Sequence, residues 1–479
     1  MDGLEISELM LSEVLKDNES FRFDAEFFSK KFILIDKILN KYNHLDEIAD
    51  TYELHSNGSF ASVFDILHDG NETSINYIKS TNIGDFFIEG ELEKISLTAH
   101  KKLSKTKTVL GDILTARTGK VGGASLITNE WINSNSNQNV VNIRLKTKEI
   151  LSMYLVTFLN CSYGINQFLQ ASTGNVQPWL NLSLLRKVKI PIFSNTFQTQ
   201  IENLVKSAYQ KLEESKTLYK QAENLLLKEL DLLDFKPTTQ NISIKSFSES
   251  FGSSGRLDSE YYLSKYIEYI EILKNYKYGW KPIQEILTND IKSGTTPKGI
   301  IKKYIPNSNY FFRAEAFNND LTLTYENLYS MSDKIFQNYP NLKVNKNDIL
   351  VSMTGTIGSV AIVTKKIDGI INQNIVKLSA NKEIINHTVL ALYIKIVGKT
   401  LLTREQTGNV QPYVNIPNFS NLIVPLIDKQ IQTQIENKIK ESFRLKEKSK
   451  ELLELAKRGV EVAIEEGEEV AIKFIKEKR

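Results

Sequence analysis

The 479-residue sequence contains a single cysteine, Cys161, which excludes an intramolecular disulfide and a zinc site built on several cysteines. Such a chain is expected in a reducing compartment, and we predict a cytoplasmic protein. No run of about 18 uncharged apolar residues occurs, so no transmembrane helix is predicted. Residues 1–19 are acidic and lack the apolar core of a signal peptide. Hydrophobic residues make up 41% of the chain, which argues against disorder.

Recognisable catalytic motifs are also missing. No Pro-Pro pair exists, so the Asn/Asp-Pro-Pro-aromatic motif of amino-methyltransferases is absent. The sequence has no Gly-x-Gly-x-x-Gly after a predicted strand, no Walker-type Gly-Lys-Ser/Thr loop and no Gly-x-Ser-x-Gly. The five histidines lack the spacing of metal ligands. These absences argue against a self-contained enzyme, and we predict neither catalytic nor metal-binding residues.

What the sequence does contain is a long internal repeat. Thr-Gly-Asn-Val-Gln-Pro at residues 173–178 recurs at 407–412, and Gln-Thr-Gln-Ile-Glu-Asn at 198–203 recurs at 432–437, both at an offset of 234 residues. An Arg-x-Asp-x-Glu triplet that begins at Arg22 recurs from Arg256 at the same offset. Chance does not explain these matches, so the chain is two copies of one plan.

Shorter matches connect the two copies in the same order. They are Gly/Asn-Asp-Ile-Leu at 111–114 and 347–350, the Thr-Gly loops at 118–122 and 354–358, and Asn-Gln-Asn at 137–139 and 372–374. By contrast, residues 50–100 and 285–340 barely resemble each other. The copies therefore share a scaffold and differ in their interior.

Each copy is predicted to open with a helix, continue with short strands and end with a long helix. Apolar residues at helical spacing predict the first helix over 26–39. Helices are also predicted at 153–168 and 389–402. Strands are predicted at 113–115, 125–128, 140–145, 349–353, 360–363 and 375–378.

The apolar residues of the first long helix, between Pro191 and Pro237, follow the 4-3-4 spacing typical of a coiled coil. A second long helix begins near Asp428. We expect the two to pair antiparallel, with two unrelated surface helices as the alternative. The predicted seam residues are Ile201, Val205, Ala208, Leu212, Tyr219, Leu226, Ile431, Ile435, Ile439 and Leu452.

The predicted fold is α+β with a pseudo-two-fold internal repeat. Two globular mixed α/β domains are joined by two long helices that form an antiparallel coiled coil. The first domain covers 1–195, the central helix 196–236 and the second domain 237–427. The distal helix and an acidic tail, with five glutamates between Glu461 and Glu469, cover 428–479.

Basic clusters are candidate contacts for nucleic-acid phosphates. The net charge is only +3, so any positive surface must be local. Lysines gather between residues 94 and 120 and again between 292 and 303, although an ordinary solvated lysine surface is the alternative. The candidate DNA-binding residues are Ser56, Asn57, Ser59, Lys79, Lys101, Lys102, Lys105, Arg117, Lys120, Lys292, Ser293, Thr295, Thr296, Lys298, Lys302 and Arg313.

The repeated loops allow two interpretations. Glycines in the Thr-Gly loops would let backbone N–H groups approach phosphates, but conformational turns are an equal alternative. The pairs Gln138-Asn139 and Gln373-Asn374 offer a donor and an acceptor, as adenine reading requires, although strand-end hydrogen bonds explain them slightly better. The aromatic residues after the hexapeptides, Trp179 and Tyr413, are expected to pack in the core.

Together these features resemble the specificity subunit of Type I restriction-modification systems. The resemblance depends on the duplicated plan, on the order of the repeated motifs and on Ser-Gly-Thr-Thr-Pro at 293–297, where the first copy has Ser-Asn-Gly-Ser-Phe at 56–60 instead. It implies two target recognition domains, each reading one half of a bipartite, asymmetric site on double-stranded DNA. We expect the base contacts from residues 55–100 and 290–320.

The resemblance also implies partners. Two modification subunits would bring S-adenosylmethionine and methylate adenine, and restriction subunits, where present, would use ATP and Mg. The long helices would act as spacers and dock these subunits, and this chain would bind no cofactor, contact no membrane and serve in phage defence. The main alternative is a non-enzymatic duplicated scaffold that binds protein or carbohydrate, and a fused nuclease or methyltransferase is a weaker one.

Overall fold

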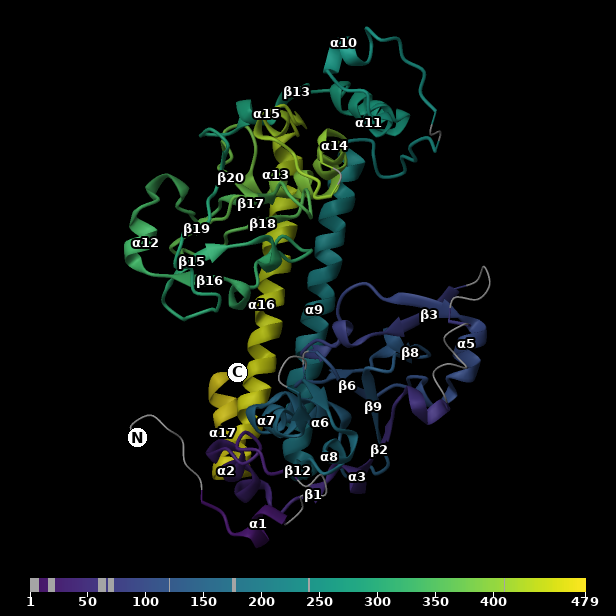
Figure 1. Ribbon diagram of the computed structural model, residues 1–479, viewed down its shortest axis with the longest axis vertical. Coiled ribbons are helices and arrows are strands. Elements are labelled where there is room, and N and C mark those ends of the chain that lie inside the picture. The colour runs from purple at the N-terminus through teal and green to yellow at the C-terminus, as the bar shows by residue number, and fades with distance from the viewer. Residues whose placement is uncertain are drawn as a thin grey trace. The chain divides into compact units, whose positions relative to one another are not determined.

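A computed structural model of the chain describes residues 8–15, 22–58, 66–67, 73–119, 121–174, 178–239, 242–408 and 410–479. They form two compact units, drawn as ribbons in Figure 1. Unit 1 is Met1–Lys211 with Glu447–Arg479, and unit 2 is Leu212–Lys446. Across these described ranges, no helix has both the length and the apolar character needed to span a bilayer.

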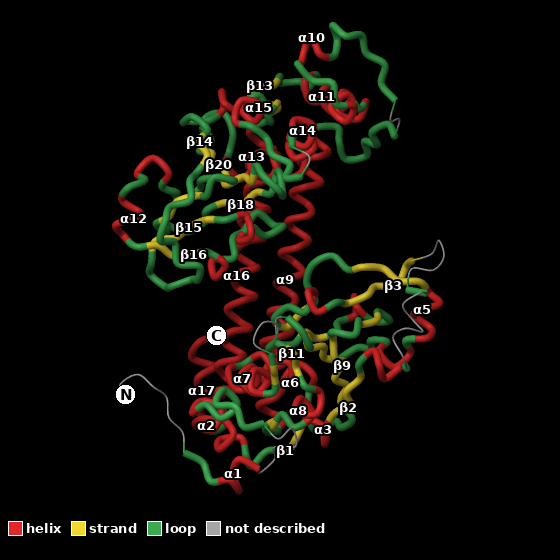
Figure 2. Tube along the Cα trace, viewed as in Figure 1, coloured by secondary structure: helices red, strands yellow, loops and turns green. Residues whose placement is uncertain are grey.

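Unit 1 is built around a central five-stranded sheet in the order β2-β9-β6-β7-β4. A three-stranded sheet, β5-β3-β8, takes β3 and β5 from the segment that differs between the copies, and β3 runs parallel to β8. Figure 2 shows these short strands in yellow. The central strands are β2 (Ala49–Tyr52), β9 (Val140–Leu145), β6 (Ile113–Ala116), β7 (Ser125–Leu126) and β4 (Phe86–Phe87). The others are β5 (Glu93–Ser96), β3 (Thr73–Ile78), β8 (Asn135–Ser136), and the pairs β1 (Asn43–His44) with β12 (Lys189–Ile190) and β10 (Ser172–Thr173) with β11 (Trp179–Leu180).

Helices cover this sheet because its strands are apolar on both faces, and all four residues of β6 are buried. Six of the nine residues of the helix α6 are apolar and seven are buried, and the helix packs against β7 and β4. The helices before the first long one are α1 (Leu11–Leu15), α2 (Lys30–Leu39), α3 (Leu45–Ile48), α5 (Leu97–Lys102), α6 (Ser152–Asn160), α7 (Ser162–Gln170) and α8 (Leu182–Arg186).

Unit 2 repeats this architecture with a central sheet in the order β14-β20-β17-β18 and a three-stranded sheet, β16-β15-β19. Its strands are β13 (Trp280–Pro282), β14 (Lys292–Ser293), β15 (Asn309–Phe312), β16 (Tyr329–Met331), β17 (Ile349–Ser352), β18 (Val360–Ile362), β19 (Gly369–Ile371), β20 (Ile375–Leu378) and β21 (Ile423–Pro425). Its helices are α10 (Phe251–Ser254), α11 (Ser264–Lys274), α12 (Asp333–Gln337), α13 (His387–Tyr393), α14 (Lys399–Glu405) and α15 (Ile416–Ser420).

The topologies agree even where the sequences do not. In unit 1, β6 pairs with β9 and β7, and in unit 2, β17 pairs with β20 and β18. The parallel pair β3–β8 has its counterpart in β15–β19. Sheet pairing uses backbone hydrogen bonds, so the same strands can form from dissimilar side chains. We call β5-β3-β8 and β16-β15-β19 the divergent sheets of the two units.

The two long helices are α9 (Asn195–Glu229) and α16 (Lys429–Glu466), and each contributes residues to both units. In unit 2, the Ser215 hydroxyl donates to the Ser442 carbonyl at 2.7 Å, and further along α9 the Gln221 side chain accepts from Lys438 at 2.7 Å. The residue numbers of α9 rise along the pair while those of α16 fall, so the two helices pair antiparallel. Of the expected seam residues, Leu212 and Ile431 are half-buried and the other eight are buried.

The first long helix ends at Glu229, short of residue 236 in the predicted boundary. Asp231 adopts a left-handed backbone with φ of 55°. Beside it, the Leu232 N–H donates to the Leu227 carbonyl at 2.8 Å and the Asp231 N–H to the Lys228 carbonyl at 3.2 Å. This is a Schellman ending, which sequence patterns signal most clearly when glycine occupies the left-handed position.

The glutamates expected to form an acidic tail belong to helices that pack on unit 1. The chain turns at Gly467 and continues as α17 (Glu468–Lys478). Glu461 accepts from the Ser162 N–H at 2.9 Å, at the start of α7, and Glu468 accepts from the Ser194 N–H at 3.1 Å, just before α9. Carboxylates at these positions satisfy N-terminal N–H groups and complement the helix dipole. Burial alone would raise the pKa of Glu461, but hydrogen bonds from Ser162 and Arg458 keep it below its usual value.

Candidate nucleic-acid interface

Three of the repeated motifs meet at one edge of the central sheet in unit 1. The Arg117 N–H, after β6, donates to the Asn139 carbonyl at 2.7 Å. The Leu180 N–H donates to the Arg117 carbonyl at 2.7 Å, and the Gly119 N–H donates to the Pro178 carbonyl at 3.3 Å. The Thr-Gly loop, the Asn-Gln-Asn segment and the end of the hexapeptide therefore lie together.

Unit 2 has the same edge with different side chains. The Met353 N–H donates to the Asn374 carbonyl at 2.8 Å, and the Val414 N–H donates to the Met353 carbonyl at 2.9 Å. The Gly355 N–H donates to the Pro412 carbonyl at 3.0 Å. We call this region the motif edge of each unit. Because the Gly119 and Gly355 N–H groups already have acceptors inside the protein, the geometry favours the turn interpretation of the Thr-Gly loops.

The motif edge exposes aromatic side chains. Trp179 is 39% exposed and Tyr413 is 47% exposed, so the prediction that both pack in the core is wrong. The Arg117 guanidinium lies 4.5 Å from the Trp179 ring centroid and forms an ion pair with Glu53. Val410, in the second hexapeptide, is 99% exposed. Each unit thus presents an aromatic or apolar surface at this edge, next to its repeated loops.

The Asn-Gln-Asn segments divide into structural and exposed residues. The side-chain oxygen of Asn137 accepts from the Asn139 N–H at 3.0 Å, and that of Asn372 accepts from the Asn374 N–H at 3.2 Å. These strand-end bonds use the side chains of Asn137 and Asn372, whereas the sequence favoured such bonds for the Gln-Asn pairs that follow them. Gln373 is instead exposed and accepts a hydrogen bond from the Thr296 hydroxyl, which connects this segment with Ser-Gly-Thr-Thr-Pro.

The glycine of Ser-Gly-Thr-Thr-Pro is required by a close backbone approach. A Cβ at Gly294 would lie 1.9 Å from the Ile371 carbonyl oxygen, in β19 of the divergent sheet. The neighbouring Thr295 N–H donates to that same oxygen at 3.2 Å. The motif therefore attaches the start of the divergent segment to its own sheet.

Replacing Gly294 with alanine is expected to destabilise unit 2 by at least about 2 kcal/mol, because backbone atoms cannot move aside as a side chain can. The loss of stability is measured by thermal unfolding, with hydrogen exchange of the unit 2 amides as the readout. Gly252→Ala is the matched control, since the nearest atom to its Cβ would be the Phe247 carbonyl oxygen at an ordinary 3.4 Å. Equal stability of the two variants would contradict the assignment.

The predicted DNA-binding residues of unit 1 have different environments. Asn57 is a structural residue, because its side chain accepts from the Lys105 N–H at 2.7 Å and donates to the Thr106 hydroxyl at 3.1 Å. The Ser56 hydroxyl accepts from the Glu53 N–H at 3.1 Å, and Lys79 forms an ion pair with Glu93. The residues that are exposed, with no ion pair to any part of the chain that the structure describes, are Lys101, Lys102 and Lys105. Ser59 and Lys120 lie outside the described residues.

In unit 2 the basic residues lie in β14 and in the connection between β14 and β15. The exposed ones, again without an ion pair among the described ranges, are Lys292, Lys298, Lys302 and Lys303. The connection is attached to β16 because the Ile301 N–H donates to the Ser330 carbonyl at 2.8 Å. Ser293 and Thr295 are half-buried, and Arg313 pairs with Glu315 and lies 4.5 Å from the Tyr329 ring centroid.

The repeated Arg-x-Asp element has a structural role in both copies. Arg22 donates to the Ser172 carbonyl at 2.8 Å, just after α7, and to Asp24 at 2.7 Å. Arg256 donates to the Gln406 carbonyl at 2.9 Å, just after α14, and to Asp258 at 2.8 Å. Each arginine thus satisfies carbonyls at a helix C-terminus, where a cation is favourable. The hydrogen bond from Arg256 also lowers the pKa of Asp258.

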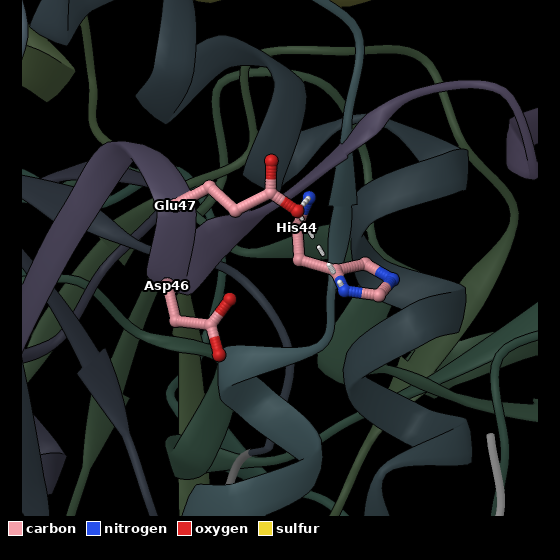
Figure 3. Close-up of side chains that lie close together, drawn as sticks. All are labelled: His44, Asp46 and Glu47. Carbon is pink, nitrogen blue, oxygen red and sulfur yellow. Dashed lines mark hydrogen bonds and ion pairs between the residues drawn. The ribbon is translucent and has the colours of Figure 1, made fainter.

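Figure 3 shows a small group of potential metal-binding side chains, His44, Asp46 and Glu47, at the start of α3. Their ligand atoms lie within 4.8 Å of one another. However, Glu47 already accepts from the His44 N–H at 3.2 Å and from the Asn43 side chain at 2.8 Å, and these bonds lower its pKa. Asp46 lies 3.6 Å from Lys187. These contacts belong to the N-terminus of α3, and we assign no metal to the three side chains.

Comparison with known proteins finds a family model that matches part of the chain. Residues 254–455 match the family model described as the Type I restriction modification DNA specificity domain. These residues are therefore similar to that specificity domain, in agreement with the resemblance predicted from the sequence.

One curated protein and several solved structures are similar to this chain. The Type I restriction enzyme EcoBI specificity subunit of Escherichia coli is 29% identical over 126 residues, which cover 26% of this chain and 27% of the relative. The match thus spans about a quarter of that relative's length. Among solved structures, a Type I restriction-modification S subunit from M. genitalium has a TM-score of 0.39 and 13% identity, covering 91% of this chain and 96% of that one. The HsdS subunit from Thermoanaerobacter tengcongensis has a TM-score of 0.28 and 14% identity, covering 89% and 97%.

Proposed function

We propose that this chain is the DNA-reading subunit of a Type I restriction-modification complex and that it recognises a bipartite, asymmetric site, one half per unit. The observation that carries the proposal is that the two units share one topology and one set of motif loops, while their divergent sheets differ in sequence. A shared scaffold suits one mode of docking used twice, and different divergent sheets suit two different sequence readouts.

The long helices fit the same function. Two half-sites must be read at a fixed distance, because a change in separation also changes the angle between them on the DNA helix. Within each unit, hydrogen bonds and buried seam residues hold α9 against α16. This pairing suits a rigid spacer better than a flexible linker.

The partners follow from the class. We propose that two modification subunits dock on surfaces that both units share, with or without two restriction subunits, and that the complex works in the cytoplasm. S-adenosylmethionine, ATP and Mg would be bound by those partners, and this chain would supply recognition without catalysis. The duplicated scaffold for protein or carbohydrate remains the other candidate, but the family match does not favour it.

Long-read methylation mapping of cells that express the chain with its modification subunit tests the proposal. The expected result is N6-methyladenine in a single two-part motif with a spacer of fixed length. Methylation that is absent, or that falls in one continuous short motif, would contradict it. Purified complex should also bind duplex DNA with an affinity that falls steeply as salt rises, whereas a protein scaffold would not.

Neutralising the exposed lysines near the divergent sheet of unit 1 is expected to weaken DNA binding without changing the methylated sequence. If Lys101, Lys102 and Lys105 each contact a phosphate, their replacement by glutamine should make the slope of log K against log salt less negative by about 2.7. The control replaces lysines that pair with glutamates along α9, namely Lys206, Lys216 and Lys220. An unchanged slope in the first variant would remove these lysines from the interface.

A further inference from the structure

A short hairpin connects the first two strands of each divergent sheet. In unit 2 it covers residues 316–324, where the Thr324 N–H donates to the Ala316 carbonyl at 2.8 Å. In unit 1 it covers residues 82–89, where the Glu89 N–H donates to the Asn82 carbonyl at 2.9 Å. We call these segments the anchor hairpins. They lie inside the parts of the chain that differ most between the copies.

The tips of the anchor hairpins share an unusual backbone. Leu321 has a φ of 68° and Phe86 a φ of 72°, which is the left-handed region that favours glycine. Both side chains are buried, at 0% and 1% exposure, and each follows an aspartate, Asp320 or Asp85. A bulky residue keeps this conformation only where its surroundings enforce it. The same strained tip therefore persists in two otherwise dissimilar segments.

Each tip is attached to the central sheet of its own unit. In unit 2 the Ile362 N–H of β18 donates to the Leu321 carbonyl at 2.8 Å. In unit 1 the Phe86 N–H donates to the Ala124 carbonyl at 3.0 Å, and the Ser125 hydroxyl of β7 donates to the Phe87 carbonyl at 3.0 Å. The hairpin thus bridges from the divergent sheet to the shared scaffold.

Each anchor hairpin also contacts a long helix, by a different chemistry in each unit. In unit 2, Lys446 of α16 forms an ion pair with Asp320 and donates to the Thr322 hydroxyl at 3.2 Å. Burial raises the pKa of Asp320, but the charge and hydrogen bond of Lys446 outweigh it and keep that pKa below its usual value. In unit 1 the Phe87 ring lies against the Tyr209 ring of α9, with 5.2 Å between their centroids.

We propose that the anchor hairpins are positioning elements that fix the direction of each divergent sheet relative to the long helix of the same unit. This rests on the proposed function, because the direction of the sheet would then decide how accurately a half-site is read. Base recognition requires side chains held to within about half an ångström, and the divergent sheets have strands of only two to six residues. An attachment at the tip of a hairpin restrains such a small sheet effectively.

The test removes the charged attachment of unit 2. Lys446→Met, in the complex with the modification subunit, is expected to lower discrimination against base changes in one half-site by about tenfold and to leave the other half-site unchanged. Binding to non-specific duplex should stay the same, because phosphate contacts do not depend on the angle of the sheet. Reversing both charges together, as Asp320→Lys with Lys446→Asp, should restore most of the discrimination.

The matched control is Lys440→Met, which removes an exposed lysine of α16 that pairs along the helix with Glu436. It should change neither half-site. A second variant, Tyr209→Leu, addresses the hairpin of unit 1 and should impair the opposite half-site, so the test does not depend on one variant folding.

Two results would overturn the proposal. One is an equal loss at both half-sites in Lys446→Met, and the other is a fall in thermal stability with discrimination unchanged, since a merely structural contact would give that pattern. Failure of the proposed function itself is distinguishable, because the unaltered complex would then show no bipartite recognition before any variant is compared.

Discussion

Exchanging residues 295–345 for the matching segment of another specificity domain is expected to replace one half of the methylated sequence and to leave the other half and the spacer unchanged. The segment contains β15 and β16, the basic connection and the anchor hairpin, and it stops before β17 of the shared sheet. Each mismatched base pair costs about 1–3 kcal/mol, so losing several contacts at the old half-site should lower its methylation by at least about a hundredfold. Long-read methylation mapping provides the readout.

The control is the corresponding exchange in unit 1, of residues 53–108, which should change the opposite half-site only. Both exchanges together should change both halves and keep the spacer. A change in both halves after a single exchange would mean that the units do not read independently.

Adding one heptad to each long helix is expected to lengthen the spacer by about three base pairs and to leave both half-sites unchanged. The insertions go at facing positions, between Gln210 and Lys211 in α9 and between Lys446 and Glu447 in α16. They leave the Lys446–Asp320 and Phe87–Tyr209 contacts of the anchor hairpins intact. Seven residues add about 10.5 Å of helix and return the seam to the same face. Methylation mapping again measures the spacer.

A two-residue insertion at the same two positions is the control. It turns the following seam residues by about 200° and should lower stability and abolish methylation at every site. An altered half-site with an unchanged spacer in the heptad variant would contradict the role of the helices as a spacer.

The scaffold could be predicted from the sequence because its signals are local or repeated. The two hexapeptides at one offset reveal the duplication, and the 4-3-4 spacing from Ile201 to Leu226 reveals the seam. Strands such as β6 and β17 could be recognised from short apolar runs beside a Thr-Gly loop. The long helix ends early because a left-handed Asp231 closes it, and aspartate at that position carries a weak signal.

The interface was harder to predict because contacts distant in the sequence decide which residues are exposed. Arg117 pairs with Glu53, 64 residues away, and Asn57 bonds to residues 105 and 106, so neither pairing can be read from local patterns. Trp179 was expected in the core, yet β11 buries Leu180 and leaves Trp179 at the surface. Lysines in the polar segment between residues 101 and 105 are exposed, as residue type alone suggests.

The packing of α17 and the end of α16 on unit 1 has a consequence for the order of folding during synthesis. Unit 2 is one continuous stretch of chain, whereas unit 1 needs residues 447–479, which the ribosome makes only after all of unit 2. Domains tend to fold as soon as their residues are available. The second copy in the sequence is therefore expected to mature first, while α7 and α9 wait for Glu461 and Glu468 to arrive at their N-termini.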